Sequence, residues 1–579
     1  MPDANLNPAE QAAASALATI QSCIEAKDNF LLEAGAGAGK TYSLVNSLQF
    51  LIKSRGSEFI HRSQRIACIT YTNVATKEIE TRTDGHPAIM SSTIHSFCWS
   101  LIKSFQAALR EEIPNLPNWH ERIDEAGGIG KQRISYDLGY PKIEEHDVWL
   151  HHNDVIALTT KLLENEKFRR ILTGRYPVLF IDEYQDTEAD FADALKKHFL
   201  SRKEGPLLGF FGDHWQRIYG TGCGKIEHPN LKPIGKQANF RSVPAIVNCL
   251  NRMRPELPQH VTNPDAQGIV AIYHTNAVNA ERRSGQHWEG DLPAEVAHQV
   301  LHNLLENLKN EGWDFNPKDA KVLMLTHNVL AAEQGYRNLA DVFPRTESYI
   351  KREDPYMAFF VDFLEPLCAA FENKHFGEMF ALLGNKSPGI RTHDDKLQWS
   401  NDMKTLMLLR TNGTVGAVLD HLKQSKHPRL PESIERKEKG LEQEPSGDTS
   451  EGEKRSIERV RNLRGISYLE VIALAKFLNE QTPFSTKHGV KGAEFENVLV
   501  VVGRGWNQYN FGQFLEWAGP DGCPADKRDA YERNRNLFYV TCSRAKRRLA
   551  VLFTQELSSK ALATIVGWFG ADNIRSIGA

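Results

Sequence analysis

The chain has 579 residues, of which 41 % are hydrophobic and 25 % charged, and a formal net charge of −3. This composition is typical of a globular protein, and the length predicts two to four domains instead of one core. The balanced charge excludes a globally basic nucleic-acid binder, so any basic groove has to be local.

Cysteine usage and apolar runs narrow the class of protein further. The eight cysteines are scattered and form no C-x-x-C pair, which argues against a disulfide framework, a zinc site and an iron–sulfur site. The N-terminus has no basic region followed by an apolar stretch, and no run is long enough to span a bilayer. We therefore expect a cytoplasmic protein with no membrane partner.

A glycine-rich segment near the N-terminus predicts a phosphate-binding loop. An apolar strand at residues 29–33 precedes it, and apolar residues at helical spacing follow it from Leu44 to Ile52. Backbone N–H groups of such a loop converge on phosphate oxygens at a helix N-terminus. Lys40 would hold the β- and γ-phosphates and the Thr41 hydroxyl would bind Mg²⁺; a glycine-rich turn without a ligand is the alternative. The loop comprises Ala34, Gly35, Ala36, Gly37, Ala38, Gly39, Lys40 and Thr41.

A second strand, residues 176–181, ends in the acidic pair Asp182-Glu183. Ligands of parallel sheets bind at the carboxyl ends of strands. We expect Asp182 to hold Mg²⁺ through water and Glu183 to orient or deprotonate the attacking water, because phosphoryl transfer is mostly positioning and electrostatics. In isolation, the pair could also be a solvated helix start.

Further motifs follow in a fixed order and carry a family resemblance. They begin at Tyr71, Ser92, Asp213, Gln237, Thr486 and Tyr539, and include Asp-Glu-x-Gln-Asp at residues 182–186 and His-x-x-Lys-Gly-x-Glu-Phe at residues 488–495. This set resembles the UvrD/Rep family of superfamily 1 DNA helicases, from about residue 6 to residue 546. The resemblance implies an ATP hydrolase that uses Mg²⁺, moves 3′ to 5′ along single-stranded DNA and separates tailed duplexes.

The resemblance also implies roles at the nucleotide. Gln11 would read adenine, although it stands one residue further from Asn7 than in many family members, and an exposed helix glutamine is the alternative. Phe240 would stack on the base, where the family more often has Tyr, and Glu494 would lie at the nucleotide edge. Arg241 and Arg544 would reach the γ-phosphate, and Gln216 would sense it.

For DNA, the resemblance implies contacts by hydroxyl, amide and aromatic side chains. Core packing is the alternative for Tyr71, and a stacking tryptophan of the family is replaced by Thr221. His151 and His152 are expected to be ordinary surface histidines and not metal ligands. The predicted DNA residues are Tyr71, Thr72, Asn73, Thr93, His95, Tyr219, Thr486 and His488.

The expected fold is α/β, with two RecA-like P-loop motor domains of parallel sheets flanked by helices. Residues 1–100 and 172–250 would form the first motor domain, with residues 101–171 as a helical insertion. Residues 251–365 and 466–579 would form the second, with residues 366–465 as a reduced insertion. Its charged segment 435–455 is expected to be a mobile tip or linker, or else a short solvated helix.

Three functional hypotheses stay open at this level. The first is a DNA helicase or translocase acting in DNA repair or phage defence. The second is a DNA-sensing ATPase subunit that works with a nuclease partner (an OLD-like one), because the chain resembles the helicase subunit of Gabija-type defence in its reduced second insertion. The third is a translocase that strips proteins from DNA without unwinding it.

Overall fold

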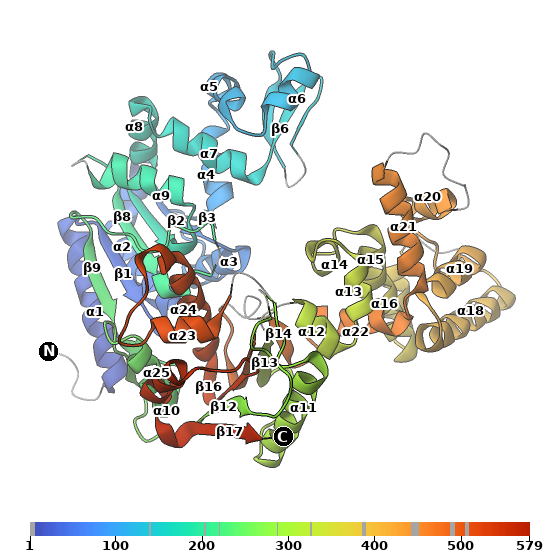
Figure 1. Ribbon diagram of the computed structural model, residues 1–579. Helices are drawn as coiled ribbons and strands as arrows, with labels where there is room; N and C mark the ends of the chain where they lie inside the picture. Colours follow the sequence, from blue (N-terminus) through green and yellow to red (C-terminus); the bar gives the residue numbers. More distant parts are fainter. Residues whose placement is uncertain are drawn as a thin grey trace.

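The computed structural model describes residues 6–137, 141–201, 204–218, 220–285, 288–324, 327–384, 390–441, 451–486, 492–503 and 509–578. Within these residues it contains two six-stranded sheets, a small three-stranded sheet, a two-stranded sheet of β10 (Ala238–Asn239) and β11 (His260–Val261), and a separate helical lobe (Figure 1). The predicted α/β class, with parallel sheets flanked by helices, is confirmed.

The first large sheet has the order β3-β2-β7-β8-β1-β9, and all its neighbouring strands are parallel. Nearly all residues of its inner strands are buried, on both faces of the sheet, as expected for a parallel sheet covered by helices. The strands are β1 (Phe30–Ala34), β2 (Ile66–Thr70), β3 (Ile89–Thr93), β7 (Val178–Asp182), β8 (Leu207–Gly212) and β9 (Lys232–Lys236).

Alternate residues of β1 serve two different cores. Phe30 and Leu32 pack in one cluster with helices on one face, whereas Leu31 packs in the cluster on the other face. The carboxyl ends of the central strands therefore lie at one edge between two helical layers. The first layer contains α1 (Pro8–Ala26), α2 (Lys40–His61) and α3 (Asn73–Arg82); the second contains α4 (Ile94–Ile102), α7 (His152–Leu162), α8 (Glu166–Arg175) and α9 (Ala189–Leu195).

The segment predicted as a helical insertion, residues 101–171, also contains a small sheet. Helices α5 (Gln106–Glu112) and α6 (His120–Glu125) precede three strands in the order β4-β6-β5. These strands have only two to four residues, too few for an alternating pattern to stand out from the helical one. They are β4 (Arg133–Tyr136), β5 (Lys142–Ile143) and β6 (Asp147–Leu150).

The second large sheet has the order β14-β13-β15-β16-β12-β17 and is also parallel throughout. Its strands are β12 (Ile269–Ala277), β13 (Ala320–Met324), β14 (Phe484–Thr486), β15 (Phe495–Val502), β16 (Ala545–Phe553) and β17 (Ile574–Gly578).

Helices also cover both faces of the second sheet. The helix α11 (Ala294–Asn310) packs on one face, and four helices pack on the other. These four are α10 (Pro244–Met253), α23 (Phe511–Trp517), α24 (Arg528–Cys542) and α25 (Ser559–Phe569). Ala36 and Trp215 of the first half of the chain join the core on this side, so the two sheets share packing.

A helical lobe stands apart from both sheets and has its own apolar core (Figure 1). This core runs from Ala331 to Leu474, so it contains the predicted insertion 366–465 and also residues 331–364. The helices are α12 (His327–Gln334), α13 (Arg337–Val342), α14 (Glu347–Ile350), α15 (Pro355–Phe359), α16 (Glu365–Glu372), α17 (Phe376–Leu383), α18 (His393–Asn412), α19 (Val415–Ser425), α20 (Glu432–Leu441), α21 (Glu451–Gly465) and α22 (Tyr468–Leu478).

The charged segment 435–455, expected to be a mobile tip or linker or else a short solvated helix, includes parts of two helices. Its first part belongs to α20, where Glu438 is buried and accepts hydrogen bonds from the Tyr356 hydroxyl at 2.9 Å and from Arg464. Its last part belongs to α21, and residues 442–450 lie outside the described residues. Residues 435–441 are thus helical, and the ion pair with Arg464 compensates the buried charge of Glu438.

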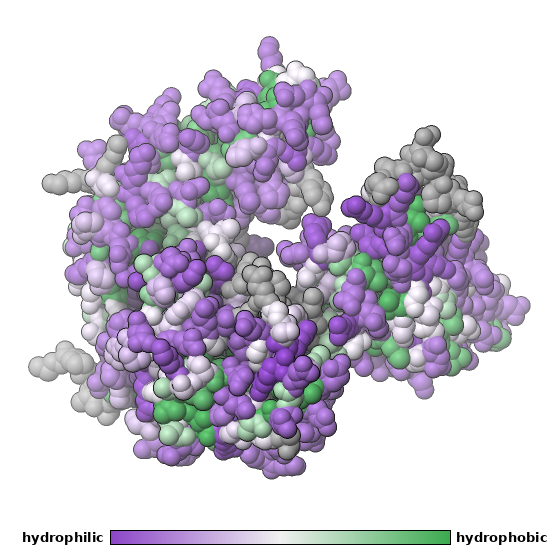
Figure 2. Space-filling view, viewed as in Figure 1, coloured by the Kyte–Doolittle hydropathy of each residue, from purple (hydrophilic) through white to green (hydrophobic). Residues whose placement is uncertain are grey.

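The described helices include none with the length and apolarity needed to cross a bilayer. The face shown in Figure 2 is largely hydrophilic and is deeply notched between the lobe of α5 and α6 and the lobe of α18 to α21. The carboxyl ends of β2 and β3 lie toward this notch (Figure 1).

Candidate nucleotide site and nucleic-acid interface

The predicted phosphate loop connects β1 to α2, with Lys40 as the first residue of the helix. Gly37 and Gly39 have φ angles of 75° and 74°, which favour glycine. A Cβ atom at Gly37 would also lie 2.8 Å from both Asn239 Oδ1 and Arg241 Cβ. The local backbone thus requires glycine at this position for two independent reasons.

The cation of the loop pairs with the acidic strand end. Nζ of Lys40 lies 3.3 Å from Oε1 of Glu183, which directly follows β7. Glu183 has a φ of 48°, an unusual value for a residue other than glycine, and its carboxylate accepts a hydrogen bond from Gln185. The backbone and a neighbouring amide therefore fix this carboxylate beside the phosphate loop.

Asp182 provides the observation that bears on a metal ion. The side chain is buried, and its Oδ1 atom has no hydrogen-bond partner among the described residues. Burial raises the pKa of Asp182 to about 7, the charge of Glu183 adds to this, and Lys40 opposes it. A buried oxygen without a donor, close to a second carboxylate, fits a divalent cation, and Thr41 is at the adjacent helix start.

A buried polar network extends from the acidic strand end to the end of β8. Oε1 of Gln185 accepts a hydrogen bond from the backbone N–H of Asp213 at 3.0 Å. Asp213 in turn accepts from Gln216 at 2.7 Å and from Arg254 at 2.6 Å. Burial would raise the pKa of Asp213, but the charges of Arg254 and Lys40 hold it below its usual value. The predicted γ-phosphate sensor Gln216 is thus connected to Glu183 through Asp213 and Gln185.

The same network reaches the base of the phosphate loop through Glu33, the residue before Ala34. Its carboxylate accepts from the Tyr184 hydroxyl and from Arg254 at 3.3 Å, and it lies 3.1 Å from His214 Nδ1. Burial and the Glu33 charge raise the pKa of Tyr184, so its hydroxyl remains a donor. The network therefore joins three strand ends, those of β1, β7 and β8.

Two arginines lie where the two halves of the chain meet: Arg241 precedes α10, and Arg544 directly precedes β16 of the second sheet. Arg241 donates to Glu494 at 2.8 Å and to the carbonyl oxygen of Ser543 at 3.0 Å. Arg544 is fully buried and donates to the carbonyl oxygens of Val540 and Ala493. Both arginines therefore stand where the first half of the chain meets the loops before β15 and β16.

The charges of these groups interact. Burial and the neighbouring Arg241 lower the pKa of Arg544, whereas the charge of Glu183 opposes this shift. An arginine stays protonated at neutral pH. Burial would raise the pKa of Glu494, but its pairing with Lys546, at 2.9 Å, and with Arg241 holds the pKa below its usual value. Glu183 is therefore within electrostatic reach of both Lys40 and Arg544.

Two residues that the sequence reasoning missed, Tyr42 and Lys236, lie beside Phe240, the residue predicted to stack on the base. Phe240 is 43 % exposed, and Tyr42, which directly follows Thr41, is 58 % exposed. The Nζ atom of the buried Lys236 lies 5.8 Å and 5.7 Å from their ring centroids and donates to the carbonyl oxygen of Gly39 at 3.0 Å and to Ser43 Oγ at 2.8 Å. The adjacency of Tyr42 to the loop was the only sequence signal.

The amide of Gln11, predicted to read adenine, donates to the backbone oxygen of Leu6 at 2.8 Å. Asn7 caps α1 and exchanges hydrogen bonds with Glu10 in a capping box. The structure therefore gives Asn7 a helix-capping role and leaves the role of Gln11 at the base a prediction.

The predicted DNA residues of the first sheet lie at the ends of neighbouring strands. Tyr71 is 45 % exposed after β2, and Thr72 and Asn73 begin α3. Thr93 caps α4 after β3, and His95 lies in its first turn. Thr486 ends β14 of the second sheet and is buried. Tyr219 and His488 lie outside the described residues.

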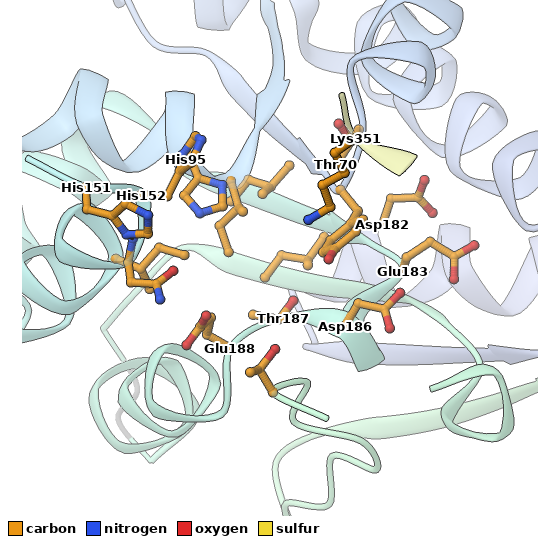
Figure 3. Close-up of a pocket in the computed structure, with 17 residues that line it drawn as sticks. Thr70, His95, His151, His152, Asp182, Glu183, Asp186, Thr187, Glu188 and Lys351 are labelled. Atoms are coloured by element: carbon orange, nitrogen blue, oxygen red, sulfur yellow. The ribbon is translucent and has the colours of Figure 1, made fainter. Parts of the chain in front are cut away.

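A cavity of about 470 Å³ is lined by Tyr71 and His95 from this set and by the acidic strand end (Figure 3). Figure 3 shows His95, His151 and His152 on one side and Asp182 and Glu183 on the other. His152 lies 4.6 Å from His95 between ring centroids, and its Nδ1 atom bonds the Tyr136 hydroxyl. His151 is exposed, as expected for a surface histidine, whereas His152 is half-buried and lines the cavity beside His95 of α4.

The surroundings of this cavity favour the uncharged forms of His95 and His152. Burial lowers the pKa of His95 to about 4, and His152 and His151 contribute to the shift. At neutral pH, His95 can therefore donate or accept a hydrogen bond but offers no charge to a phosphate.

Helix α24 also joins the second sheet to the turn after β8. The Asn536 amide donates to the carbonyl oxygens of His214 and Arg217, both at 3.0 Å. The Trp215 ring packs edge-on against Tyr539 at 5.3 Å and beneath the Arg535 guanidinium at 4.1 Å. Sequence reasoning did not single out Asn536 or Arg535, because their partners are about 320 residues away.

Comparisons with known proteins agree with this arrangement. A family model described as an AAA domain matches residues 18–222. Gabija protein GajB of Bacillus cereus (strain HuB5-5) is 23 % identical over 93 % of this chain and 95 % of its own. ATP-dependent DNA helicase Rep of Escherichia coli (strain K12) is 26 % identical over 47 % of this chain and 48 % of its own.

ATP-dependent DNA helicase PcrA of Staphylococcus epidermidis (strain ATCC 12228) is 25 % identical over 48 % of this chain and 44 % of its own. The chain thus spans about half the length of Rep and PcrA and nearly all of GajB. The resemblance that the motifs indicated is therefore confirmed: this chain is similar to the helicases of the UvrD/Rep type and, over almost its whole length, to a Gabija protein.

Proposed function

We propose that this protein is an Mg²⁺-dependent ATP hydrolase that moves 3′ to 5′ along single-stranded DNA and acts on tailed duplexes in the cytoplasm. One observation carries the proposal: Glu183 pairs with Lys40 of the phosphate loop and is also within electrostatic reach of Arg544 from the second sheet. A nucleotide between these groups would connect both halves of the chain.

The proposed chemistry follows from the positions of the side chains. Lys40 would hold the β- and γ-phosphates, and Asp182 and Thr41 would hold Mg²⁺, which neutralises the phosphate charge when bound. Glu183 would orient the attacking water. Arg241 and Arg544 would stabilise the negative charge that develops on the γ-phosphate, and Phe240 and Tyr42 would stack on the base.

ATP hydrolysis would be coupled to DNA binding through the buried polar network and the cavity. Gln216 and Gln185 connect the ends of β7 and β8, and the cavity joins Glu183 to His95. The DNA backbone would cross the ends of β2 and β3, with Thr72, Asn73 and Thr93 at phosphates and Tyr71 stacked on a base. When the two sheets close around ATP, the bound DNA strand would shift by one step.

The test compares ATP turnover by the purified protein with no nucleic acid, single-stranded DNA, forked DNA and RNA. Stimulation by single-stranded DNA, with unwinding of 3′-tailed but not of 5′-tailed duplexes, is the expected result. Turnover that ignores DNA in all four conditions would reject the proposal. Glu183→Gln is the background control, because it should remove turnover without removing DNA binding.

A second candidate is supported by the match to a Gabija protein over nearly the whole chain. In this case the protein would be the DNA-sensing ATPase subunit of a complex with a nuclease, and it would unwind little. DNA-stimulated turnover without strand separation, together with co-purification of a nuclease from the native host, would favour this candidate. Movement that displaces a bound protein from DNA, without either result, would favour a stripping translocase.

A further inference from the structure

Two histidines and a glutamate converge at the border between the second sheet and the helical lobe. His298 and His302 are four residues apart on α11, and their ring centroids are 4.2 Å apart. Oε2 of Glu333, on α12, lies 2.7 Å from Nδ1 of His298 and 3.7 Å from Nε2 of His302. One ligand atom from each residue lies within 4.8 Å of the others. We propose that these three side chains form a site for a divalent transition-metal ion.

The chemistry of the three donors favours Zn²⁺ or Ni²⁺ over Mg²⁺ or Ca²⁺. Imidazole nitrogen suits zinc, copper and nickel, whereas magnesium and calcium prefer oxygen ligands. Ligand atoms about 2.0–2.1 Å from a tetrahedral ion lie roughly 3.3 Å apart. The two distances from Glu333 bracket this value, so side-chain rotations are enough to admit the ion.

The exposure of the donors differs in a way that suits ion capture. The Glu333 side chain is only 8 % exposed, so packing holds its carboxylate in place. The side chains of His298 and His302 are 53 % and 52 % exposed and can rotate toward an ion from solvent. The hydrogen bond between His298 and Glu333 is the interaction that a metal ion would replace.

The location gives this site a mechanical role. Leu330 of α12 packs in the core of the second sheet, and the next residue, Ala331, packs in the core of the helical lobe. Helix α11 packs on the second sheet through Leu301 and Leu304. An ion held by α11 and α12 would connect α12, the first helix of the lobe, to the second sheet and would limit rotation of the lobe.

The binding test is a calorimetric titration of the full-length protein with Zn²⁺ or Ni²⁺ alone, in excess Mg²⁺ so that the phosphate-loop site is occupied. Wild-type protein should bind one ion. The double variant His298→Ala/His302→Ala should lose this binding step, and so should the separate single variant Glu333→Ala. The control is His375→Ala, which removes an exposed histidine 3.5 Å from Glu378 on α17, where no second histidine has been found among the described residues. It should leave binding unchanged.

Identical titrations of wild-type and double-variant protein would overturn the site. Cobalt absorption spectra give a second readout: nitrogen and oxygen ligation is expected, and intense thiolate bands would assign the ion to a cysteine instead. The Glu183→Gln protein should bind the ion normally, so failure of the proposed ATP hydrolysis and failure of this site can be told apart.

The tie between the helices is tested by hydrogen exchange of α12. Zn²⁺ should slow exchange of its amides in wild-type protein and leave the double variant unchanged. Metal binding without any slowing would overturn the mechanical role, even though the site itself would stand.

Discussion

Nζ of Lys40 lies 3.3 Å from Oε1 of Glu183, so one ion pair joins the proposed phosphate-binding cation to the proposed water-orienting carboxylate. A γ-phosphate would compete with Glu183 for this cation. Binding of ATP would therefore release the carboxylate to act on water at the moment when the substrate is in place, and hydrolysis would restore the pair.

Glu183→Gln should lower kcat for ATP by about 10²–10⁴, because the amide cannot accept a proton from the attacking water. Lys40→Ala should abolish turnover as well. The matched control is Glu188→Gln, which changes a carboxyl group that lines the same cavity and has a pKa raised by burial. Phosphate release under saturating ATP measures the effect, and undiminished turnover in either main variant would reject the site assignment.

Arg544→Ala should lower kcat by about 10³–10⁵, as loss of an arginine that stabilises phosphoryl transfer does. Arg548 is the control: it lies on β16, is half-buried, and donates to the Gly312 carbonyl away from the site. Single-turnover hydrolysis separates this step from nucleotide binding. Equal rates for the Arg544 and Arg548 variants would show that Arg544 only stabilises the fold.

Asn536→Ala should reduce the stimulation of ATP turnover by DNA more than the basal rate. The variant leaves two carbonyl oxygens between the sheets without their donor, at a cost of about 1–3 kcal/mol. Asn534→Ala is the comparison, because that buried amide donates to Ala530 of its own helix. The ratio of stimulated to basal rates is the measurement, and a proportional loss of both rates would contradict a coupling role.

Tyr42→Ala should raise KM for ATP about tenfold with little change in kcat, since stacking on a base contributes about 1–3 kcal/mol. Phe240→Ala should behave in the same way. The control Phe376→Ala removes an equally exposed aromatic ring from the helical lobe. Unchanged KM in both main variants would place the base elsewhere.

Lys236 makes the free energy of unfolding depend on pH. Burial lowers its pKa from 10.5 to about 8. Between these values the unfolded chain binds more protons than the folded one, so the free energy of unfolding rises with pH, by at most about 3 kcal/mol. Below pH 8 Lys236 is protonated in both the folded and the unfolded state, so the free energy of unfolding no longer changes with pH through this group.

Lys236→Met lacks this titration, so the stability of the native chain relative to this variant should increase between pH 8 and 10.5. Urea midpoints at fixed pH values measure the difference. Lys232→Met, which removes an exposed lysine of the same strand, should follow the native pH profile. Parallel profiles for native and Lys236→Met protein would show that Lys236 does not titrate in this range.

The sequence was sufficient where the determinants are local. The phosphate loop and the Asp182-Glu183 strand end are short patterns whose flanking apolar runs predict their strands. The sequence analysis did not predict Tyr42, Lys236 and Asn536, because their proposed roles depend on residues that the two sheets bring together. A single lysine or asparagine forms no recognisable sequence pattern. The small sheet β4–β6 escaped because strands of two to four residues are too short for a periodic signal.

The two hydrogen bonds of Asn536 have a consequence for how the molecule could advance. A side-chain amide has only two hydrogens, and both are committed to the turn at residues 214–217. A movement of α24 away from this turn would break both bonds together, which favours discrete arrangements of the two halves over a continuous range of positions. If the proposed movement along DNA alternates between such arrangements, it would proceed stepwise and not by smooth sliding.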